Sequence, residues 1–282
     1  MMDIKTYAPI EWCPGCGNFG ILSVIEEILL EMRDSGELLE NFILLSGVGN
    51  HAKIVDYIHV NSFYTIHGRA VPVGEAIKLA NPNTKVICFV GDGDGFAEGL
   101  SHLVFAAKRN ADMTILVHDN RTYALATGQF TPTSQSSYRA STMPEGAKEV
   151  SFNPLELMMA SGASFIARGY PLKKDHFKSI VRKAISHKGF SIVDVLQVCV
   201  TFNNLYEDYN SNVNEDSIKD TGNREDALKI IRKWDYTETK VPIPVGIFYQ
   251  EDRKCFEEFY SPFKEDRLER SSILDGILQS LE

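Results

Sequence analysis

Hydrophobic and polar residues alternate between two kinds of segment along the first 200 positions. Short, uninterrupted apolar runs predict buried strands, and segments whose apolar residues recur every three or four positions predict helices. Strands that are apolar throughout and separated by helices indicate a parallel sheet covered on both faces. The predicted fold is therefore α/β, a doubly wound, mostly parallel sheet. The predicted strands are 41–46, 85–90, 113–118, 164–167 and 191–195, and the predicted helices are 18–32, 69–79, 97–109, 154–161 and 172–187.

This regular pattern is interrupted by a long loop and weakens towards the C-terminus. Residues 127–151 are rich in Ser, Thr and Gln without periodicity, and a loop of that length inside a compact domain is usually functional. Residues 208–225 are polar and are predicted to form a loop, whereas 241–250 are apolar with two prolines, which suits an edge strand. We expect an α/β domain over residues 1–202 and a charged C-terminal extension over 203–282.

Composition and charge exclude several classes of protein. The chain is 44% hydrophobic and 24% charged, which is typical of a globular domain. A formal charge of −9 argues against the basic surface that nucleic acid requires. No segment reaches the length and apolarity of a membrane span, and the N-terminus lacks the apolar region of a signal peptide. We therefore expect a cytoplasmic protein that binds neither nucleic acid nor membranes.

The five cysteines are too few and too scattered for a secreted disulfide scaffold. Only Cys13 and Cys16 are close together, as Cys-Pro-Gly-Cys, and in a reducing compartment such a pair serves either as metal or cluster ligands or as a redox dithiol. A thioredoxin-like dithiol follows a strand, and no strand is predicted before residue 11, so we favour the ligand interpretation. Cys88, inside a predicted strand, is expected in the core.

Polar residues collect at the ends of two predicted strands. Strand 85–90 leads into Gly-Asp-Gly-Asp-Gly, which contains Asp92, and strand 113–118 leads into Asp-Asn, which contains Asn120. Ligands of doubly wound sheets bind beyond the carboxyl ends of the strands. A carboxylate and an amide placed there can share Mg²⁺, which in turn holds a diphosphate, and the glycines let backbone approach phosphate oxygens. An ordinary turn is the alternative, but the strand–helix–strand spacing disfavours it.

This arrangement resembles the thiamine diphosphate motif, in which Gly-Asp-Gly is followed one crossover later by Asn. Flanking sequences in the expected order narrow the resemblance to the β subunit of a 2-oxoacid:ferredoxin oxidoreductase, over residues 10–202 and again at 246–250. The matching segments are Trp12-Cys13-Pro14-Gly15-Cys16-Gly17-Asn18, Thr65-Ile66-His67-Gly68-Arg69-Ala70, Gly91-Asp92-Gly93-Asp94, Asp119-Asn120 with Tyr123, Gly128-Gln129 with Pro132-Thr133, and Gly246-Ile247-Phe248-Tyr249-Gln250.

The resemblance implies that the 1–202 domain binds thiamine diphosphate, and it implies roles for particular residues of that domain. Mg²⁺ would be bound by Asp92, Asn120 and the carbonyl group of Thr122. Lys53 matches an active-site lysine of the family, although it could equally be a surface residue, and His67 is a catalytic candidate or a structural histidine at a helix start. The cofactor-binding candidates implied by the resemblance are His67, Arg69, Gly91, Asp92, Gly93, Asp94, Asn120 and Tyr123.

The resemblance also implies a [4Fe–4S] cluster bound by four cysteines. Cys13, Cys16 and Cys199 match three of these positions, but Asn50 stands at the fourth. Four thiolates normally hold such a cluster, and an amide is a poor substitute. The neighbouring His51 could supply an imidazole, the cluster could keep three protein ligands, or it could be labile or absent.

The implied activity is the oxidative decarboxylation of a 2-oxoacid to acyl-CoA, with electrons passing through the cluster to ferredoxin. One chain carries only the diphosphate half of a thiamine site, so an α subunit must supply the glutamate that activates the aminopyrimidine. The 203–282 extension would pack on the core and on this partner subunit. Residues 123–129, Tyr-Ala-Leu-Ala-Thr-Gly-Gln, depart from the Gly-x-Thr of relatives. The substrate therefore stays open among pyruvate, 2-oxoglutarate and branched acids.

Two other functions fit part of the sequence. A catalytically altered paralogue, regulatory or assembly-related, would keep the fold without a normal cluster, and Asn50 supports it. A Rossmann nucleotide-binding protein is suggested by Gly-Val-Gly-Asn-His-Ala at 47–52, which follows a predicted strand. However, the acidic residue expected about 20 positions later is missing, because the sequence around residue 67 is His-Gly-Arg.

Overall fold

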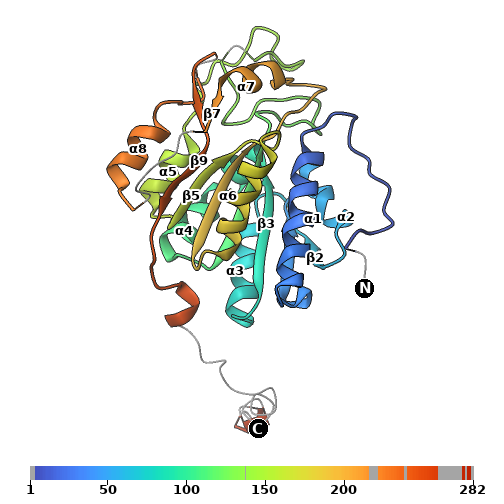
Figure 1. Ribbon diagram of the computed structural model, residues 1–282, viewed down its shortest axis with the longest axis vertical. Helices are drawn as coiled ribbons and strands as arrows, with labels where there is room; N and C mark the ends of the chain where they lie inside the picture. Colours follow the sequence, from blue (N-terminus) through green and yellow to red (C-terminus); the bar gives the residue numbers. More distant parts are fainter. Residues whose placement is uncertain are drawn as a thin grey trace.

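The computed structural model describes residues 4–136, 138–215, 222–237, 240–259, 275–276 and 278–280. Its centre is a seven-stranded sheet in the order β2-β1-β3-β4-β6-β5-β9 (Figure 1). All neighbouring strands are parallel except β9, which runs antiparallel to β5. The predicted mostly parallel α/β sheet is confirmed. The strands are β1 (Phe42–Ser46), β2 (Asn61–Tyr64), β3 (Lys85–Gly91), β4 (Met113–Asp119), β5 (Phe165–Gly169), β6 (Phe190–Leu196) and β9 (Gly246–Gln250).

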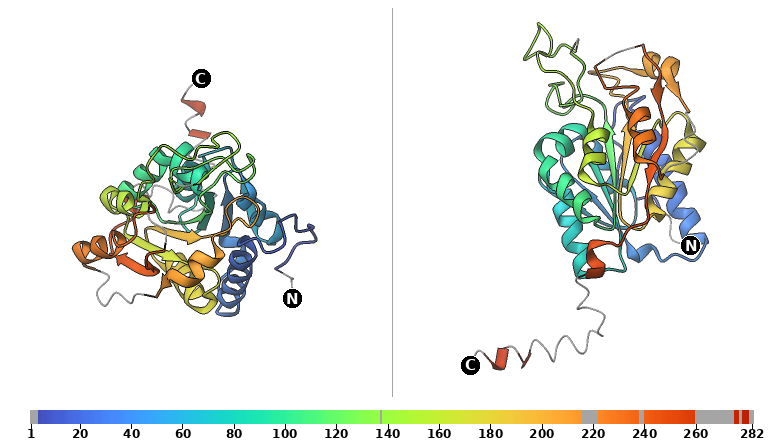
Figure 2. Two further views of the ribbon diagram at one scale, coloured as in Figure 1. Left: turned by 90° about the horizontal axis from the view of Figure 1, so that it is seen from above. Right: turned by 90° about the vertical axis from the view of Figure 1, so that its left-hand side faces the viewer.

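Helices cover both faces of this sheet, as a doubly wound fold requires (Figures 1 and 2). One face carries α1 and α6, which contact each other, and the other carries the row α3, α4, α5 and α8. The five predicted helices and the five predicted strands are all present. The helices on the two faces are α1 (Asn18–Asp34), α6 (Lys174–Ser186), α3 (Ala70–Ala80), α4 (Leu100–Arg109), α5 (Pro154–Ser161) and α8 (Arg224–Ile231).

The side chains of β3 show how the sheet divides the hydrophobic core. Ile87 and Phe89 pack on the side of α1 and α6, whereas Val86, Cys88 and Val90 pack on the side of α3 and α4. Strand residues alternate between faces, and an apolar residue at every position is therefore required when both faces are buried. Cys88 is fully buried, so its predicted place in the core is confirmed.

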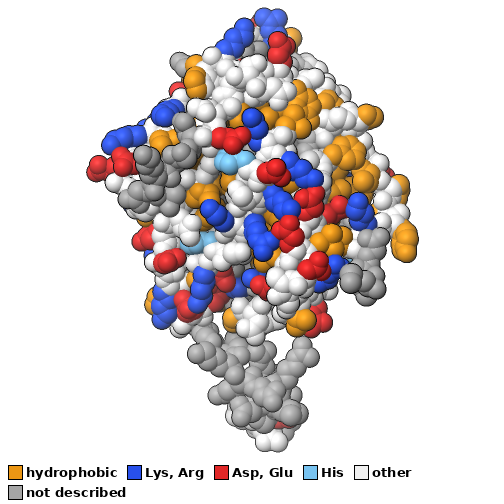
Figure 3. Space-filling model, in the orientation of Figure 1, with side chains coloured by type: hydrophobic (Ala, Val, Ile, Leu, Met, Phe, Trp, Pro, Cys, Tyr) orange, Lys and Arg blue, Asp and Glu red, His pale blue; other side chains and the backbone are white. Residues whose placement is uncertain are grey.

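Charge pairs connect the solvent-facing sides of α1 and α6. Glu31 of α1 bonds to Lys178 and Arg182 of α6, and Glu27 bonds to Lys174 and Lys178. Acidic and basic side chains are intermixed across the centre of the face seen in Figure 3. Exposed pairs of this kind contribute at most about 1 kcal/mol each, so burial of the apolar stripe beneath them decides the packing.

The predicted loop over 208–225 was wrong at both ends. The helix α7 (Tyr206–Asn212) covers its beginning, and α8 starts before its end. Tyr209 is fully buried and packs edge-on against Tyr170, with ring centroids 5.8 Å apart, and this anchor orders an otherwise polar helix. Residues 216–221 of the predicted loop lie outside the described residues.

The C-terminal extension contributes to the sheet itself. The predicted edge strand within 241–250 is confirmed by β9, which pairs with β5 at the end of the sheet. None of the helices in the described ranges is both long and apolar enough to span a membrane. The remaining short elements are η1 (Leu39–Asn41), η2 (Asn50–Lys53), α2 (Ile54–Tyr57), η3 (Asp94–Glu98), η4 (Phe256–Phe259), β7 (Val213–Asn214) and β8 (Ile243–Pro244).

Candidate functional site

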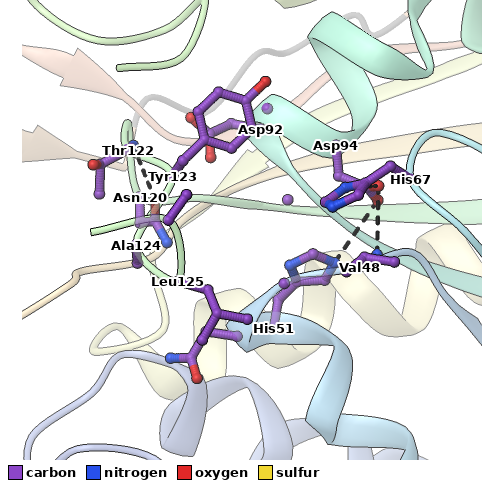
Figure 4. Close-up of a pocket in the computed structure, with 15 residues that line it drawn as sticks. Val48, His51, His67, Asp92, Asp94, Asn120, Thr122, Tyr123, Ala124 and Leu125 are labelled. Atoms are coloured by element: carbon purple, nitrogen blue, oxygen red, sulfur yellow. Dashed lines mark hydrogen bonds and ion pairs between the residues drawn. The ribbon is translucent and has the colours of Figure 1, made fainter. Parts of the chain in front are cut away.

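A cavity lies at the carboxyl ends of β1, β3 and β4, where the loops that follow these strands meet (Figure 4). Its walls come from residues 48–51, His67, residues 91–94, Asn120 and residues 122–126. Most of the site residues predicted from the sequence therefore surround one space. Those in the lining are His51, His67, Gly91, Asp92, Gly93, Asp94, Asn120, Thr122 and Tyr123.

Asp92 provides a buried carboxylate to this cavity, since only 2% of its surface is exposed. The hydroxyl of Thr133 lies 2.8 Å from Asp92 Oδ2 and 2.8 Å from Asp119 Oδ1. Burial raises the pKa of Asp92 to about 6 against the opposing effect of its hydrogen bonds, and burial beside Asp194 and Asp92 raises the pKa of Asp119 well above its usual range. A cation would restore the ionised form of Asp92 by replacing the water that burial removes.

The turn after β4 places two further residues with oxygen ligands, Asn120 and Thr122, in the lining. The side-chain oxygen of Asn120 accepts a hydrogen bond from the Thr122 amide at 3.0 Å, and the Asn120 carbonyl accepts one from Asn203 at 3.1 Å. The Thr122 hydroxyl donates to the Gln129 carbonyl at 2.9 Å. Carboxylate, amide and carbonyl oxygens are the donors that Mg²⁺ prefers, so the residues present fit the predicted metal and its diphosphate.

Asp94 joins the loops that follow three strands. Its Oδ1 accepts hydrogen bonds from the amides of Gly68 at 2.8 Å and Val48 at 3.4 Å, and it lies 3.6 Å from His67 Nδ1 (Figure 4). Burial raises the pKa of Asp94 to about 6, whereas the two amides lower it. A Cβ atom on Gly47 would lie 1.7 Å from Asp94 Oδ2. This carboxylate therefore fills the space above the Gly-x-Gly loop, where a dinucleotide pyrophosphate would have to bind.

His51 forms a neutral part of the cavity wall. Burial, with a smaller effect of the nearby His67, lowers its pKa to about 3. Its Nε2 atom has no hydrogen-bond partner among the described residues, and its ring centroid lies 5.5 Å from that of His118. His118 in turn is bonded through Nδ1 to Asn18 Oδ1 at 2.8 Å. Two buried imidazoles thus connect the cavity to the start of α1.

Gly93 is required because the ring of Tyr123 lies directly over it. A Cβ atom on Gly93 would lie 2.2 Å from Cε1 of that ring. The Tyr123 hydroxyl donates to Glu98 at 3.1 Å, and burial raises the pKa of Tyr123 above its usual value. Tyr123 therefore covers the Gly-Asp-Gly turn.

Two predicted residues do not contribute to the cavity lining. Lys53 forms ion pairs with Glu11 at 3.0 Å and Asp56 at 3.2 Å, and these partners raise the pKa of its ammonium group. Arg69 is exposed and donates to the carbonyls of Gly68 and Glu98. Their roles in catalysis and in cofactor binding stay predictions.

The three cysteines predicted as cluster ligands, Cys13, Cys16 and Cys199, lie on two adjacent loops. Thr201 donates to Cys13 Sγ at 3.5 Å, and Gln197 donates to Cys16 Sγ at 3.6 Å. Cys13 is exposed, whereas Cys16 and Cys199 are buried. Burial, together with Cys199 and Cys13 nearby, raises the pKa of Cys16 to about 11.

The sulfur atoms of these three cysteines are not arranged as a metal site. Within the described ranges, no three His, Cys, Asp or Glu side chains are grouped closely enough to hold a metal ion. At the position of the fourth family cysteine, Asn50 lines the cavity and accepts a hydrogen bond from the Trp12 indole through its carbonyl, at 2.8 Å. The donor set therefore falls short of the four thiolates that hold a [4Fe–4S] cluster.

The structure also shows site residues that the sequence did not single out. Thr133 belongs to one of the matching segments but carried no predicted role, although its hydroxyl holds Asp92, and the long loop 127–151 that contains it was the available signal. Asn203 and His118 gave no signal, because their partners, Asn120 and Asn18, are distant in the sequence.

The chain is similar to known proteins over most of its length. A family model described as "Thiamine pyrophosphate enzyme, C-terminal TPP binding domain" matches residues 47–195. A second family model, for the C-terminal region of the pyruvate ferredoxin oxidoreductase β subunit, matches residues 199–265. Together the matched segments contain every residue that lines the cavity and the extension as far as residue 265.

Individual relatives extend over most of the chain. It is 38% identical over 254 residues to the β subunit of 2-oxoacid:ferredoxin oxidoreductase 1 from Aeropyrum pernix, which covers 85% of this chain and 77% of the relative. It is 37% identical over 281 residues to the 2-oxoacid:ferredoxin oxidoreductase β subunit of Saccharolobus solfataricus, covering 94% and 88% of the two chains.

A solved structure shows the same fold. The 2-oxoglutarate:ferredoxin oxidoreductase from Magnetococcus marinus, with 2-oxoglutarate, coenzyme A and succinyl-CoA bound, superposes with a TM-score of 0.85 at 29% identity. The alignment covers 96% of this chain and 94% of that chain.

Proposed function

The chain belongs to the family of 2-oxoacid:ferredoxin oxidoreductase β subunits, and from this premise we propose that it binds Mg²⁺ and thiamine diphosphate for the oxidative decarboxylation of a 2-oxoacid. The acyl group passes to coenzyme A and the electrons pass to ferredoxin. The substrate is a 2-oxoacid, and membership of the family does not determine its side chain.

One observation carries this proposal: Asp92, Asn120 and Thr122 converge on one cavity within the segment matched by the thiamine pyrophosphate family model. Thiamine diphosphate, when bound, supplies the nucleophilic carbon and the electron sink for decarboxylation. This chain's residues bind and orient it. Asp92, Asn120 and the Thr122 carbonyl hold Mg²⁺.

The diphosphate itself would meet the remaining residues of the proposed site. Gly91 and Gly93 allow backbone to approach phosphate oxygens, and His67, Asp94 and Tyr123 complete the lining of the cavity. Arg69 remains a cofactor-binding candidate, because a guanidinium can form bidentate contacts with phosphate and this one bonds only to the Gly68 and Glu98 carbonyls among the bonds of the described residues. We retain Lys53 and His67 as the catalytic candidates of this chain.

The proposed enzyme needs a second chain. The carboxylates that line the cavity in the described residues are Asp92 and Asp94, and both are already hydrogen-bonded within the wall. The glutamate that activates the aminopyrimidine must therefore come from an α subunit. An apolar groove next to His67, formed by β2 and α3 and including Phe63, Tyr64 and Ile66, offers a surface for that subunit.

An iron–sulfur cluster is part of the proposal with a reduced ligand set. We assign Cys13, Cys16 and Cys199 as its protein ligands, with a fourth position that no cysteine fills and for which His51, next to Asn50 in the sequence, is the candidate. The alternative is a catalytically altered paralogue without a cluster. Iron and acid-labile sulfide in anaerobically prepared protein distinguish the two: their absence, with intact thiamine diphosphate binding, would favour the paralogue.

The metal site is tested by Asp92→Asn in the complex with the α subunit. We expect Mg²⁺-dependent thiamine diphosphate binding, measured by titration calorimetry, to fall at least about 100-fold, because a charged ligand of the cation is lost. Asp175→Asn is the matched control, since it removes the same charge from an exposed position of α6. Unchanged binding in Asp92→Asn would contradict the proposal.

A further inference from the structure

Arg121 lies between the two metal-site residues Asn120 and Thr122, yet its side chain is not part of the cavity lining. It is 1% exposed, and its φ of 61° is in the left-handed region, which costs a residue other than glycine about 1 kcal/mol or more. A strained residue persists only where its surroundings fix it. The contacts of Arg121 therefore show what holds the metal-binding turn.

The guanidinium of Arg121 joins three segments of the chain. Nε donates to the Thr133 carbonyl at 2.7 Å, and Nη1 donates to Gln135 Oε1 at 3.3 Å. Nη2 donates to the carbonyl of Tyr236, in the C-terminal extension. The Arg121 carbonyl accepts a hydrogen bond from Ser134 at 2.6 Å. The turn after β4 is thus bonded both to the long loop and to the extension.

Thr133 connects the same arginine to Asp92. Its carbonyl accepts from Arg121, and its hydroxyl lies 2.8 Å from Asp92 Oδ2. Asn120 and Thr122 are the sequence neighbours of Arg121. Each proposed metal ligand is therefore either a sequence neighbour of Arg121 or, for Asp92, hydrogen-bonded to the threonine that Arg121 holds.

Aromatic side chains of the extension form the far side of this cluster. Trp234 and Tyr236 are buried and stacked, with ring centroids 4.1 Å apart, and Arg121 Cζ lies 5.5 Å and 5.9 Å from these two centroids. Such cation–π contacts hold a guanidinium in a desolvated site. Tyr236 also has a left-handed φ, of 69°. Two strained residues thus meet at one hydrogen bond.

We propose that Arg121, fixed by Trp234 and Tyr236, is a positioning residue for the metal and diphosphate site. The C-terminal extension thereby sets the affinity of a cavity that it does not line. This inference rests on the proposed assignment of Mg²⁺ to Asp92, Asn120 and Thr122. Lysine keeps the charge but loses the planar fork that reaches three acceptors, so the turn would lose its fixed geometry.

Arg168 offers a matched control. It is equally buried and contacts the same two aromatic rings, with Cζ 4.8 Å from the Trp234 centroid and 5.1 Å from that of Tyr236. Its guanidinium bonds to Asp194 at 2.9 Å, to the Tyr236 hydroxyl at 3.0 Å and to the Pro244 carbonyl at 3.1 Å. These partners all lie outside the metal-binding turn. Substitution of Arg168 therefore tests general damage to the cluster.

The experiment compares Arg121→Lys, Arg168→Lys and Asp92→Asn in the complex with the α subunit, by calorimetric titration with Mg²⁺ and thiamine diphosphate and by thermal unfolding. We expect both arginine variants to lower the melting temperature, but only Arg121→Lys to weaken cofactor binding, by about 10- to 50-fold, as about 1.4 kcal/mol corresponds to each factor of ten. In turnover assays it should raise KM for the cofactor more than it lowers kcat.

Gln135→Leu keeps the test decisive if Arg121→Lys does not fold. It removes one acceptor of Arg121 from a half-buried position, and we expect about 3-fold weaker binding. Equal weakening in Arg121→Lys and Arg168→Lys would overturn the inference, as would normal binding in Arg121→Lys or, in its place, Gln135→Leu. If Asp92→Asn alone loses binding, the proposed function stands without the inference. If Asp92→Asn binds normally, both fail.

Discussion

The cavity and the cysteine loops lie close together but are built differently. In the cavity, two of the three proposed ligands have a hydrogen-bonded side chain: Asp92 is bonded to the Thr133 hydroxyl, and Asn120 to the Thr122 amide. In the cysteine loops, the sulfur atoms of Cys13 and Cys16 accept hydrogen bonds from the Thr201 hydroxyl and the Gln197 amide, at 3.5 Å and 3.6 Å. The proposed metal ligands are thus brought together around one cavity, whereas within the described residues the cysteines are not grouped closely enough to hold a metal ion.

Gly93→Ala is the strongest test of this difference. The backbone of Gly93 is right-handed helical, so alanine is sterically allowed there, but its Cβ would overlap the Tyr123 ring. We expect thiamine diphosphate binding to fall about 100-fold or more, as the displaced ring disturbs a preorganised site. Fluorescence titration of the complex with the α subunit measures this loss.

A double variant supplies the control for that prediction. Tyr123→Ala removes the atoms that an alanine at position 93 would overlap. Gly93→Ala combined with Tyr123→Ala should therefore bind the cofactor as Tyr123→Ala alone does. A double variant as weak as Gly93→Ala would show that the ring clash is not the cause.

The pH dependence of stability should show that the cavity is preorganised for a cation. Burial raises the pKa of Asp92 to about 6, above the unfolded value of about 3.9. The folded metal-free chain therefore binds the proton more tightly than the unfolded chain does, and its free energy of unfolding falls as the pH rises from about 4 through 6.

Cofactor binding should reverse this loss. Mg²⁺ with thiamine diphosphate is expected to raise the melting temperature much more at pH 7.5 than at pH 5, because the cation stabilises the ionised carboxylate. Differential scanning calorimetry at the two pH values checks it, with Asp92→Asn as the control that lacks the titrating group. An equal rise at both pH values would argue against Asp92 as a ligand.

Asn50→Cys should give the cysteine loops a complete set of ligands, as the cavity already has for its proposed metal. A thiol at this position would complete the four thiolates of the family pattern. We expect about one additional iron per chain after anaerobic reconstitution and slower loss of iron in air, measured by iron and sulfide analysis and by electron paramagnetic resonance. Asn50→Ser, which adds no thiolate, should behave as the unmodified chain. Equal iron contents in both variants would place residue 50 outside the ligand set.

The smallest expected effect concerns the order of thiol labelling. In cluster-free protein, iodoacetamide should modify the exposed Cys13 before Cys16, which is buried and has a pKa of about 11, because the thiolate is the reactive form. Fragment-ion mass spectrometry after brief labelling resolves the two residues. Unfolded protein should lose the difference, and earlier labelling of Cys16 would mean that the loops are arranged otherwise.

The sequence predicted the parts of the molecule that depend on local pattern. The apolar runs of β3 and β4 predicted where these strands end, and therefore that Asp92 and Asn120 lie at the same edge of the sheet. The strand β2 was missed because all four of its residues are exposed, so it lacks the apolar signal of the other strands. The helix α7 was missed because a single buried residue, Tyr209, orders it.

Long-range contacts in the site could not be predicted in the same way. Arg121 meets Tyr236 across a sequence separation of 115 residues, and nothing in the composition near either residue marks the pair. Lys53 shows the opposite limit: a position in a family motif does not determine where a flexible side chain points, and here it bonds to Glu11 and Asp56.

The free edge of the sheet has a practical consequence for producing this chain. Among the described residues, β2 pairs with a strand on one side only, and its residues Phe63 and Tyr64 are 55% and 44% exposed. The unpaired backbone groups of an uncovered edge strand are a template for strands of other chains, and exposed aromatic residues add to the attraction. Recombinant chain made alone should self-associate, whereas co-expression with the α subunit should give monodisperse material at higher yield.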